Sequence, residues 1–148
     1  MEKKIVKPFW SDTSRLVKSE DLNHHGTLFA GRTAEWFVES GFVSAAALIN
    51  PKNVVCLKIH GMYFTKPVRP GQILKFSSKI VFAGKSSLVA YIQVTTGIDN
   101  ESFVNGFITF IHVDETTNAT PHNIEIQPQT EEEQALYDQA RMLRKSYL

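Results

Sequence analysis

Two carboxylates in an apolar stretch are the residues of this sequence best placed to do chemistry. Glu35 and Glu39 lie within residues 30–49, where small and apolar residues recur at the spacing of one long helix. Other hydrophobic residues lie off the main stripe, so we expect this helix to be buried on several sides. A buried carboxylate is costly unless it is hydrogen-bonded or takes part in a reaction. Glu39 is therefore the first candidate for a functional group.

The loop before this helix is the second feature of interest. It reads Asn-His-His-Gly-Thr-Leu-Phe-Ala-Gly over residues 23–31. An asparagine such as Asn23 often bonds its own backbone in a turn of this kind. We expect the adjacent His24 and His25 to point in different directions, which does not resemble a metal site. With one cysteine and no histidine pair at ligand spacing, the sequence predicts no metal.

The rest of the chain reads as strands that must position these groups. Alternating patterns and turn signals predict five strands, over residues 13–20, 53–64, 73–82, 87–95 and 103–113. Short turns join the later strands, so these strands must run antiparallel. A helix too apolar for solvent, placed before an antiparallel meander, predicts an α+β fold in which a curved sheet wraps around the helix. Hydrophobic residues on both faces of the sheet indicate that the second face meets another subunit.

The length of 148 residues fits a single domain, which we place over residues 1–125. A connector and a surface helix should follow over residues 126–148. Thr130 and Glu133 form the pattern of a capping box at the start of that helix, and basic residues at its far end suit the helix dipole.

Composition excludes several classes of protein. A formal net charge of +1, with 21% charged residues, gives no basic surface for nucleic acid or for an anionic membrane. No apolar run has the length of a membrane span, and the N-terminus lacks a signal-peptide core. The single cysteine, Cys56, lies in an apolar run, so we expect a buried, inert thiol in a reducing compartment. These features predict a cytoplasmic protein.

An ordered set of motifs resembles the acyl-CoA thioesterases of the hotdog fold. The set comprises Asn23-x-x-Gly26-x-x-Phe29-x-Gly31, Trp36, Phe-Thr-Lys-Pro-Val-Arg-Pro-Gly over residues 64–71, Gly-Lys-Ser-Ser over residues 84–87, and Phe-Ile-Thr-Phe-Ile-His-Val-Asp over residues 107–114. No single motif is specific, but their order and spacing hold over residues 13–122. The resemblance implies a hotdog fold, in which the sheet wraps a long central helix.

The same resemblance implies an activity and an assembly. The activity is hydrolysis of an acyl-CoA thioester to free CoA and a carboxylic acid, and it needs no cofactor. The assembly is a homodimer or a higher homo-oligomer, a tetramer or a hexamer, with the active sites at the dimer interface.

Individual residues take roles from the resemblance. Asn23 falls where the family has an Asn or Asp that helps to hold the attacking water or the thioester. Where the family commonly has Met-Asp-Glu in the helix, this chain has Phe37-Val38-Glu39, so Val38 replaces the usual catalytic Asp. Glu39 is then either the catalytic carboxylate or a buried structural group. His60, near a position where relatives often carry a carboxylate, is either an alternative base or a structural residue.

Further residues are assigned to the substrate. Free backbone amides near Gly31, at the helix N-terminus, would stabilise the oxyanion. Lys66 and Arg69 are either phosphate contacts or solvated turn residues. One turn falls where the family meets the nucleotide portion of CoA, although as bare sequence it is an ordinary hairpin turn without the glycine spacing of a P-loop. Its residues are Gly84, Lys85, Ser86 and Ser87.

Alternatives to a hydrolase stay open. A hotdog protein that has lost its chemistry would bind acyl-CoA without cleaving it, and Val38 supports this reading. A hotdog dehydratase has less support, because the helix lacks a His-x-x-x-x-Asp dyad. The sequence does not specify the acyl chain, since its length depends on tunnel shape and on side chains of the partner subunit.

Overall fold

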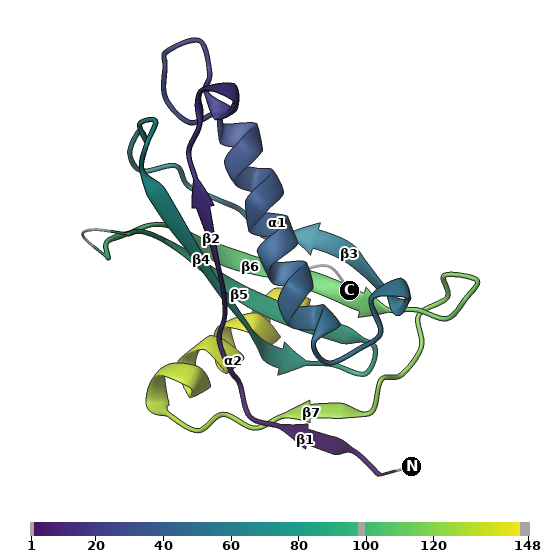
Figure 1. The fold of residues 1–148 in the computed structure, drawn as a ribbon. Coiled ribbons are helices and arrows are strands. Elements are labelled where there is room, and N and C mark those ends of the chain that lie inside the picture. Colours follow the sequence, from purple (N-terminus) through teal and green to yellow (C-terminus); the bar gives the residue numbers. More distant parts are fainter. Residues whose placement is uncertain (1, 98–99, 146–148) are drawn as a thin grey trace.

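Five antiparallel strands form a curved sheet that holds a long helix, α1, on one face (Figure 1). The computed structural model describes residues 2–97 and 100–145. The elements are β1 (Lys4–Val6), β2 (Ser11–Leu16), the 3-10 turn η1 (Ser19–Asp21), α1 (Ala30–Ala46), the 3-10 turn η2 (Pro51–Asn53), β3 (Val54–Ile59), β4 (Ile73–Ala83), β5 (Ser87–Thr96), β6 (Ser102–His112), β7 (Ile124–Ile126) and α2 (Glu131–Lys145). The sheet order is β2-β4-β5-β6-β3. This arrangement confirms the expected α+β plan.

Helix α1 is buried on the side that faces the sheet and exposed along one stripe. Trp36, Phe37 and Gly41 are on the buried side. A Cβ on Gly41 would lie 3.2 Å from both Ile92 and Phe110, so the missing side chain lets the sheet approach closely. The exposed stripe comprises Gly31, Glu35, Glu39 and Val43. The prediction that both carboxylates are buried is therefore wrong for this chain, because they occupy the stripe that faces away from the sheet.

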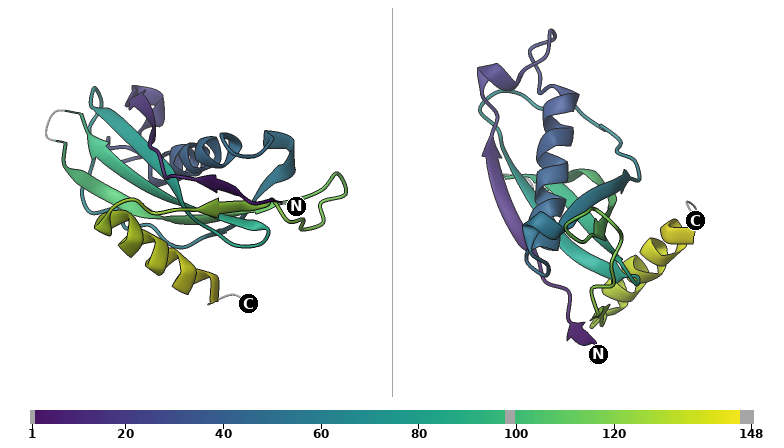
Figure 2. Two further views of the ribbon diagram at one scale, coloured as in Figure 1. Left: turned by 90° about the horizontal axis from the view of Figure 1, so that it is seen from below. Right: turned by 90° about the vertical axis from the view of Figure 1, so that its right-hand side faces the viewer.

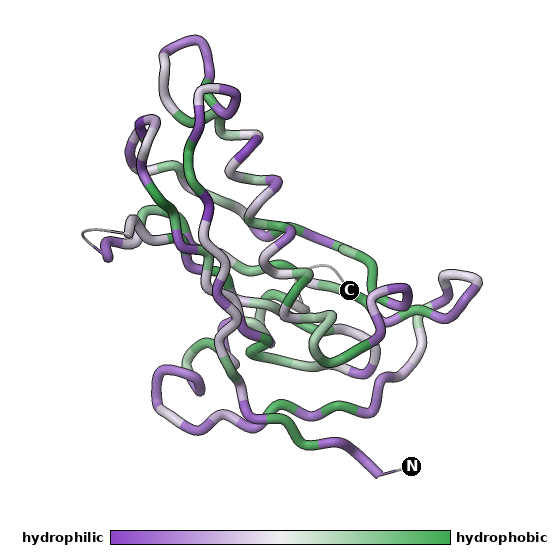
Figure 3. The backbone as a smooth tube through the Cα atoms, viewed as in Figure 1, coloured by the Kyte–Doolittle hydropathy of each residue, from purple (hydrophilic) through white to green (hydrophobic). Residues whose placement is uncertain are grey.

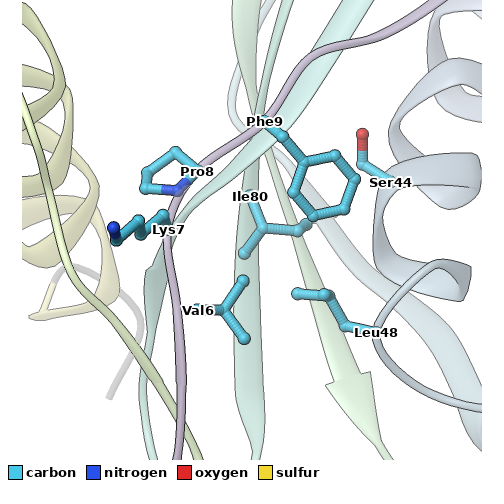
Figure 4. Close-up of a pocket in the computed structure, with 7 residues that line it drawn as sticks. All are labelled: Val6, Lys7, Pro8, Phe9, Ser44, Leu48 and Ile80. Atoms are coloured by element: carbon cyan, nitrogen blue, oxygen red, sulfur yellow. The ribbon is translucent and has the colours of Figure 1, made fainter.

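Three serines mediate the contact between α1 and β4. The hydroxyl oxygens of Ser44 and Ser78 are 2.5 Å apart, and the Ser78 hydroxyl donates to the carbonyl of Ser40 at 2.7 Å. A cavity of about 10 Å³ lies beside Ser44, under residues 6–9 of the N-terminal segment (Figure 4). It has room for about one water molecule, so it is not a substrate site.

The second face of the sheet is partly covered by the chain's own C-terminal helix. Figure 2 shows α2 on the side of the sheet opposite to α1. Leu136 and Ala140 of α2 pack against Val81, Phe82 and Val89 of the sheet. The apolar residues on this part of the second face therefore find partners within the chain. Contact of the rest of this face with another subunit stays a prediction.

Polar contacts help to dock α2. The Thr130 hydroxyl accepts the N–H of Glu133 at 3.1 Å, which confirms the predicted cap, and the Glu133 carboxylate accepts the N–H of Gln129 at 2.7 Å. Lys79 is only 4% exposed on the second face. Its ammonium lies 3.9 Å from the Glu133 carboxylate and 4.1 Å from the centre of the Trp10 ring. Burial of this charge is thus compensated by an anion and an aromatic face.

Strand β3 is a sheet edge with an exposed apolar surface. It pairs only with β6 among the described strands, and Val55, Leu57 and Ile59 are 40%, 52% and 41% exposed. In Figure 3 the loops and turns are mostly hydrophilic, whereas β3 carries hydrophobic residues along most of its length. Cys56 is also exposed, so the prediction of a buried thiol is wrong. Partial desolvation raises the pKa of Cys56, which keeps the thiol protonated and argues against a nucleophile.

Sequence patterns misplaced two strand ends and missed one pair of strands. β2 ends at Leu16, and β3 ends at Ile59, well before the predicted end at residue 64, since Gly61 has a φ of 119° that breaks the extended run. β1 and β7 form a separate parallel pair. Three residues are too few to show a period in the sequence.

No helix in residues 2–97 and 100–145 is long and apolar enough to cross a membrane.

His122 joins the loop before β7 to the start of β5. Its Nε2 lies 2.9 Å from the Ser87 carbonyl, and its Nδ1 accepts the N–H of Ile124 at 2.9 Å. Because one ring nitrogen must accept, the neutral imidazole is the form that fits. Burial, the main cause, lowers the pKa of His122.

We predict that this histidine makes the fold sensitive to acid. With a pKa lowered in the folded state, its contribution is fully present above the unfolded value of about 6.5 and is lost as pH falls towards the folded value. Replacing it (His122→Asn) should lower the free energy of unfolding near pH 7.5 by about 1–3 kcal/mol and should flatten the fall towards pH 5.5. Urea unfolding at both pH values measures this. An equal fall in both proteins would contradict the assignment.

Candidate functional site

A cavity of about 210 Å³ lies at the N-terminal end of α1. Its walls come from the loop before α1, the first turn of α1, the segment after β3 and the start of β6. The lining residues are Asn23, Leu28, Ala30, Thr33, Phe64, Lys66, Pro67, Val68 and Phe103. The structure therefore brings the predicted Asn23 and Lys66 together, beside the first turn that contains Gly31.

The first turn of α1 presents backbone amides at this cavity. Phe29 is the N-cap, and its carbonyl accepts the N–H of Arg32 at 3.0 Å and of Thr33 at 3.2 Å. The amides of Ala30 and Gly31 precede these bonds and have no acceptor within the helix. A Cβ on Gly31 would lie 2.5 Å from the Phe29 ring, so glycine lets this ring fold back over the turn. The helix dipole makes this end favourable for negative charge.

Asn23 holds the loop in shape and also lines the cavity. Its Oδ1 accepts the N–H groups of His25 at 2.8 Å and Thr27 at 3.2 Å, and its Nδ2 donates to the Thr27 hydroxyl at 3.1 Å. The turn-forming role is therefore present. A carboxamide has a second N–H, which can still serve a ligand in the cavity. The rings of His24 and His25 lie only 3.9 Å apart at a 43° tilt, so the prediction that they diverge is wrong.

Glu39 lies away from this cavity, on the exposed stripe of α1, where its carboxylate reaches Arg15 of the edge strand β2. Its carboxylate is 2.6 Å from the guanidinium of Arg15, and its side chain is 51% exposed. The Arg15 guanidinium also lies 5.4 Å from the centre of the Trp36 ring. Val38, the residue before Glu39, packs against the core instead. Gly31 and Glu39 are separated by about 12 Å along the helix axis, so one protomer does not bring both to the same thioester.

His60 lies on the second face of the sheet, towards α2. Its Nε2 is 2.7 Å from the Thr109 hydroxyl, and its backbone N–H donates to the Phe107 carbonyl at 2.9 Å. It lines a cavity of about 410 Å³ with Phe107 and with Met142 of α2. Burial lowers the pKa of His60, and the nearby positive charge of Lys58 lowers it to a lesser extent. The imidazole is therefore neutral near pH 7, but the sheet separates it from Asn23 of the same chain.

The predicted nucleotide-binding turn lies at the other end of α1. Trp36 meets Phe76 of β4 and Ser44 meets Ser78, so β4 runs alongside α1 towards the helix C-terminus. Gly84, which follows β4, lines a cavity of about 530 Å³ there. The positively charged residues that line this cavity are Lys3 and Lys85, and its other lining residues include His122 and Tyr137.

The other residues that the sequence assigned to substrate binding make mainly structural contacts. The Ser86 carbonyl accepts the N–H of His112 at 2.7 Å, and Ser87 is buried. Arg69 is exposed in its turn, where its N–H donates to the Gln72 side chain at 2.8 Å. Lys66 lies 2.9 Å from the Glu101 carboxylate. Within residues 2–97 and 100–145, no three His, Cys, Asp or Glu side chains come together as a metal site would require.

Sequence reasoning missed Asp21 and Arg32, which meet beside the cavity. Asp21 is 4% exposed, and its carboxylate lies 3.3 Å from Arg32 Nε. An aspartate in a loop is usually exposed and gave no signal of burial. Arg32 gave no sign of Asp21 either, because Glu35, three residues further along the helix, is the partner that the sequence suggests, and it lies 3.7 Å from the Arg32 guanidinium.

Comparisons with known proteins identify relatives of this chain. Residues 25–102 match the thioesterase superfamily. The chain is 28% identical over 144 residues to YkhA, an uncharacterized acyl-CoA thioester hydrolase of Bacillus subtilis. The aligned region covers 94% of this chain and 78% of that protein.

Solved structures share the fold. An acyl-CoA hydrolase from Bacillus cereus has a TM-score of 0.83 at 24% identity, over 93% of this chain and 85% of that one. A hexameric acyl-CoA thioesterase, solved in its apo form, has a TM-score of 0.83 at 28% identity, over 93% of this chain and 89% of that one.

Proposed function

Because this chain belongs to the thioesterase superfamily, we propose that it hydrolyses acyl-CoA thioesters to free CoA and a carboxylic acid. The fold is the expected hotdog, a sheet wrapped around α1. The observation that carries the proposal is the N-terminal end of α1, where Ala30 of the first turn lines a cavity together with Asn23, Thr33 and Lys66. The first amides of the helix have no acceptor within the helix. The apolar walls of the cavity, Leu28, Phe64 and Phe103, suit the uncharged part of an acyl-CoA.

In this proposal, water attacks the thioester carbonyl carbon directly. The water oxygen forms the new C–O bond while negative charge develops on the carbonyl oxygen. The amides of Ala30 and Gly31 stabilise that charge, a contribution of about 3–4 kcal/mol when such donors are in place. A base takes one proton from the attacking water. The C–S bond then breaks, that proton passes to the leaving sulfur so that CoA departs as the thiol, and the acid is released. Asn23 orients the water or the carbonyl oxygen.

We further propose that the complete site forms between two protomers. Within one chain, Glu39 and the first-turn amides are too far apart, and the turn with Lys85 lies at the opposite end of α1. A two-fold axis perpendicular to α1 reverses the direction of this helix in the partner, so such an axis would place the far end of one protomer beside the N-terminal cavity of the other. The free edge of β3, with its exposed Val55 and Leu57, supports pairing there.

A hexamer built from such dimers is the assembly we propose. The hexameric relative at 28% identity supports it. Residues assigned to CoA, Lys66 on one protomer and Lys85 on its partner, would then serve one substrate molecule.

Two groups are candidates for activating the water, and their surroundings differ. We assign the role to Glu39 of the partner subunit, the carboxylate next to Val38. In the single chain its charge is paired with Arg15, and this pair would have to admit the water. His60 is the alternative, since it is neutral near pH 7 and ready to accept a proton.

One observation favours a second candidate function, acyl-CoA binding without cleavage. Val38 supplies no carboxylate where the resembled family has one, and Glu39 is already paired with Arg15. The first experiment below separates the two functions.

We predict that the purified protein releases CoA from some acyl-CoA. The measurement is the appearance of free thiol in a colorimetric assay with short, medium, long and aromatic acyl chains, with heat-denatured protein as the control. Binding of several acyl-CoAs without release above the uncatalysed rate would contradict hydrolysis and favour the binding protein.

We also predict which group acts as the base. Glu39→Gln should lower kcat by on the order of a hundredfold while the melting temperature stays near that of the wild type. Glu35 is not used as the control, because its carboxylate lies 3.7 Å from Arg32 in the first turn of α1. The control is Glu115→Gln, which removes the same charge from an exposed residue in the loop after β6. Its kcat should not change.

The alternative base has a distinct signature. If His60 is the base, His60→Asn removes the acidic limb of the pH–rate profile, which lies below the ordinary histidine pKa of about 6.5 because that of His60 is lowered. Full activity in Glu39→Gln with normal melting, together with loss of that limb in His60→Asn, would overturn the assignment to Glu39.

A further inference from the structure

Asp21 is a buried carboxylate at the base of the loop that carries Asn23. Its residue is 4% exposed, whereas the side chain of Arg32, with which it pairs, is 36% exposed. The mechanism proposed above uses neither residue. Burying a charged carboxylate costs free energy unless its contacts compensate for the lost water. The groups that contact Asp21 are therefore the ones that this residue holds in place.

The contacts of Asp21 converge on the first turn of α1. One carboxylate oxygen accepts the N–H of Lys18 at 2.9 Å, and the other lies 3.3 Å from Arg32 Nε. The backbone carbonyl of Asp21 accepts the N–H of Phe29, the N-cap of α1, at 2.9 Å. One residue thus joins the turn η1, the N-cap and the first helical turn.

The same contacts close the loop over residues 22–28. Leu22 and Leu28 form an isolated antiparallel bridge directly inside the Asp21–Phe29 hydrogen bond. Within that bridge, the N–H of Asn23 donates to the Thr27 carbonyl at 2.7 Å. The position of Asn23 relative to the helix amides is therefore set by a stem whose outermost pair is Asp21 and Phe29.

Charge gives the Asp21–Arg32 pair a second effect. A carboxylate near a helix N-terminus is favourable in the resting protein, but an unpaired one would repel an oxyanion that develops at the same end. The Arg32 guanidinium compensates the Asp21 charge at 3.3 Å. It also lies 3.7 Å from the carboxylate of Glu35, whose side chain is 56% exposed and is therefore screened by solvent. We propose that the Asp21–Arg32 ion pair is a positioning device, which fixes Asn23 against the first turn of α1 and keeps that turn free of uncompensated negative charge.

This inference rests on the proposed function, in which that turn stabilises the oxyanion. It predicts a pattern among variants that a stabilising ion pair alone would not produce. A pair that only stabilises the fold changes the melting temperature and leaves kcat per folded molecule intact. A pair that tunes the site changes kcat, and the size of the loss depends on which partner is left behind.

The test compares four variants by kcat, KM and melting temperature on the acyl-CoA that the wild type cleaves best. Arg32→Gln leaves the buried carboxylate unpaired and should lower kcat by on the order of ten- to a hundredfold with KM changed by less than about threefold. Arg32→Lys restores a cation and should recover most of kcat. Adding Asp21→Asn to Arg32→Gln removes the unpaired charge and should recover part of it. Glu20→Gln is the matched control, since Glu20 lies in the same turn η1, is 69% exposed and pairs only with Lys18 among the described residues.

Each outcome decides the inference. The proposed order of kcat is wild type, then Arg32→Lys, then the double variant, then Arg32→Gln, with Glu20→Gln equal to the wild type. Unchanged kcat in Arg32→Gln, or a double variant no faster than Arg32→Gln, would overturn the positioning role while leaving the hydrolase intact. A wild type that releases no CoA would instead overturn the proposed function and this inference with it.

Discussion

The close packing of α1 against the middle of the sheet is the contact on which the rest of the structure depends. Small residues make it possible, because Gly41 leaves space for Ile92 and Phe110, while Ser40, Ser44 and Ser78 bond across the contact. Since β4 runs alongside the helix, this contact also fixes where each end of α1 lies. The N-terminal amides then meet the segment after β3, and the two together enclose a cavity.

The same packing also determines which groups a single protomer does not bring together. A helix pressed against a sheet shows solvent only one stripe, and Glu35 and Glu39 lie on it. The core side next to Glu39 carries Val38, where the resembled family carries its aspartate. The amides, the carboxylate, the imidazole of His60 and the turn with Lys85 therefore lie in four places on the chain. An exposed β3 edge gives the physical means for a second protomer to bring such groups together.

Much of the fold could be predicted from the sequence, because its signals are local. Alternation over ten or more residues located β4, β5 and β6, and Thr130 marked the start of α2. The exposure of Cys56 could not be predicted, since an apolar run reads alike in a central and an edge strand. The covering of the second face by α2 was missed for a related reason, because hydrophobic residues do not show which element buries them.

The candidate site was predictable only in part. The sequence predicted the elements near whose ends Asn23, Gly31 and Lys66 lie. The structure brings these three residues together at the N-terminal end of α1. His60 and Asn23 fall on opposite faces of the sheet, which depends on the register of β3 and on the break at Gly61. Asp21 was missed because nothing in the loop sequence shows that this residue is buried or that its carboxylate lies 3.3 Å from Arg32 of the helix.

The claim that the active site is shared between protomers can be tested directly with mixed dimers. Co-expression of an Asn23→Ala chain with a Glu39→Gln chain, each carrying a different tag, followed by purification on both tags, gives an assembly that contains both chains. If Asn23 and Glu39 of partner chains serve one site, each mixed dimer within that assembly has one intact site of two. With equal, random pairing the assembly should then recover about a quarter of the wild-type kcat although each parent is impaired. A mixed assembly no more active than the mean of its two parents would contradict the shared site.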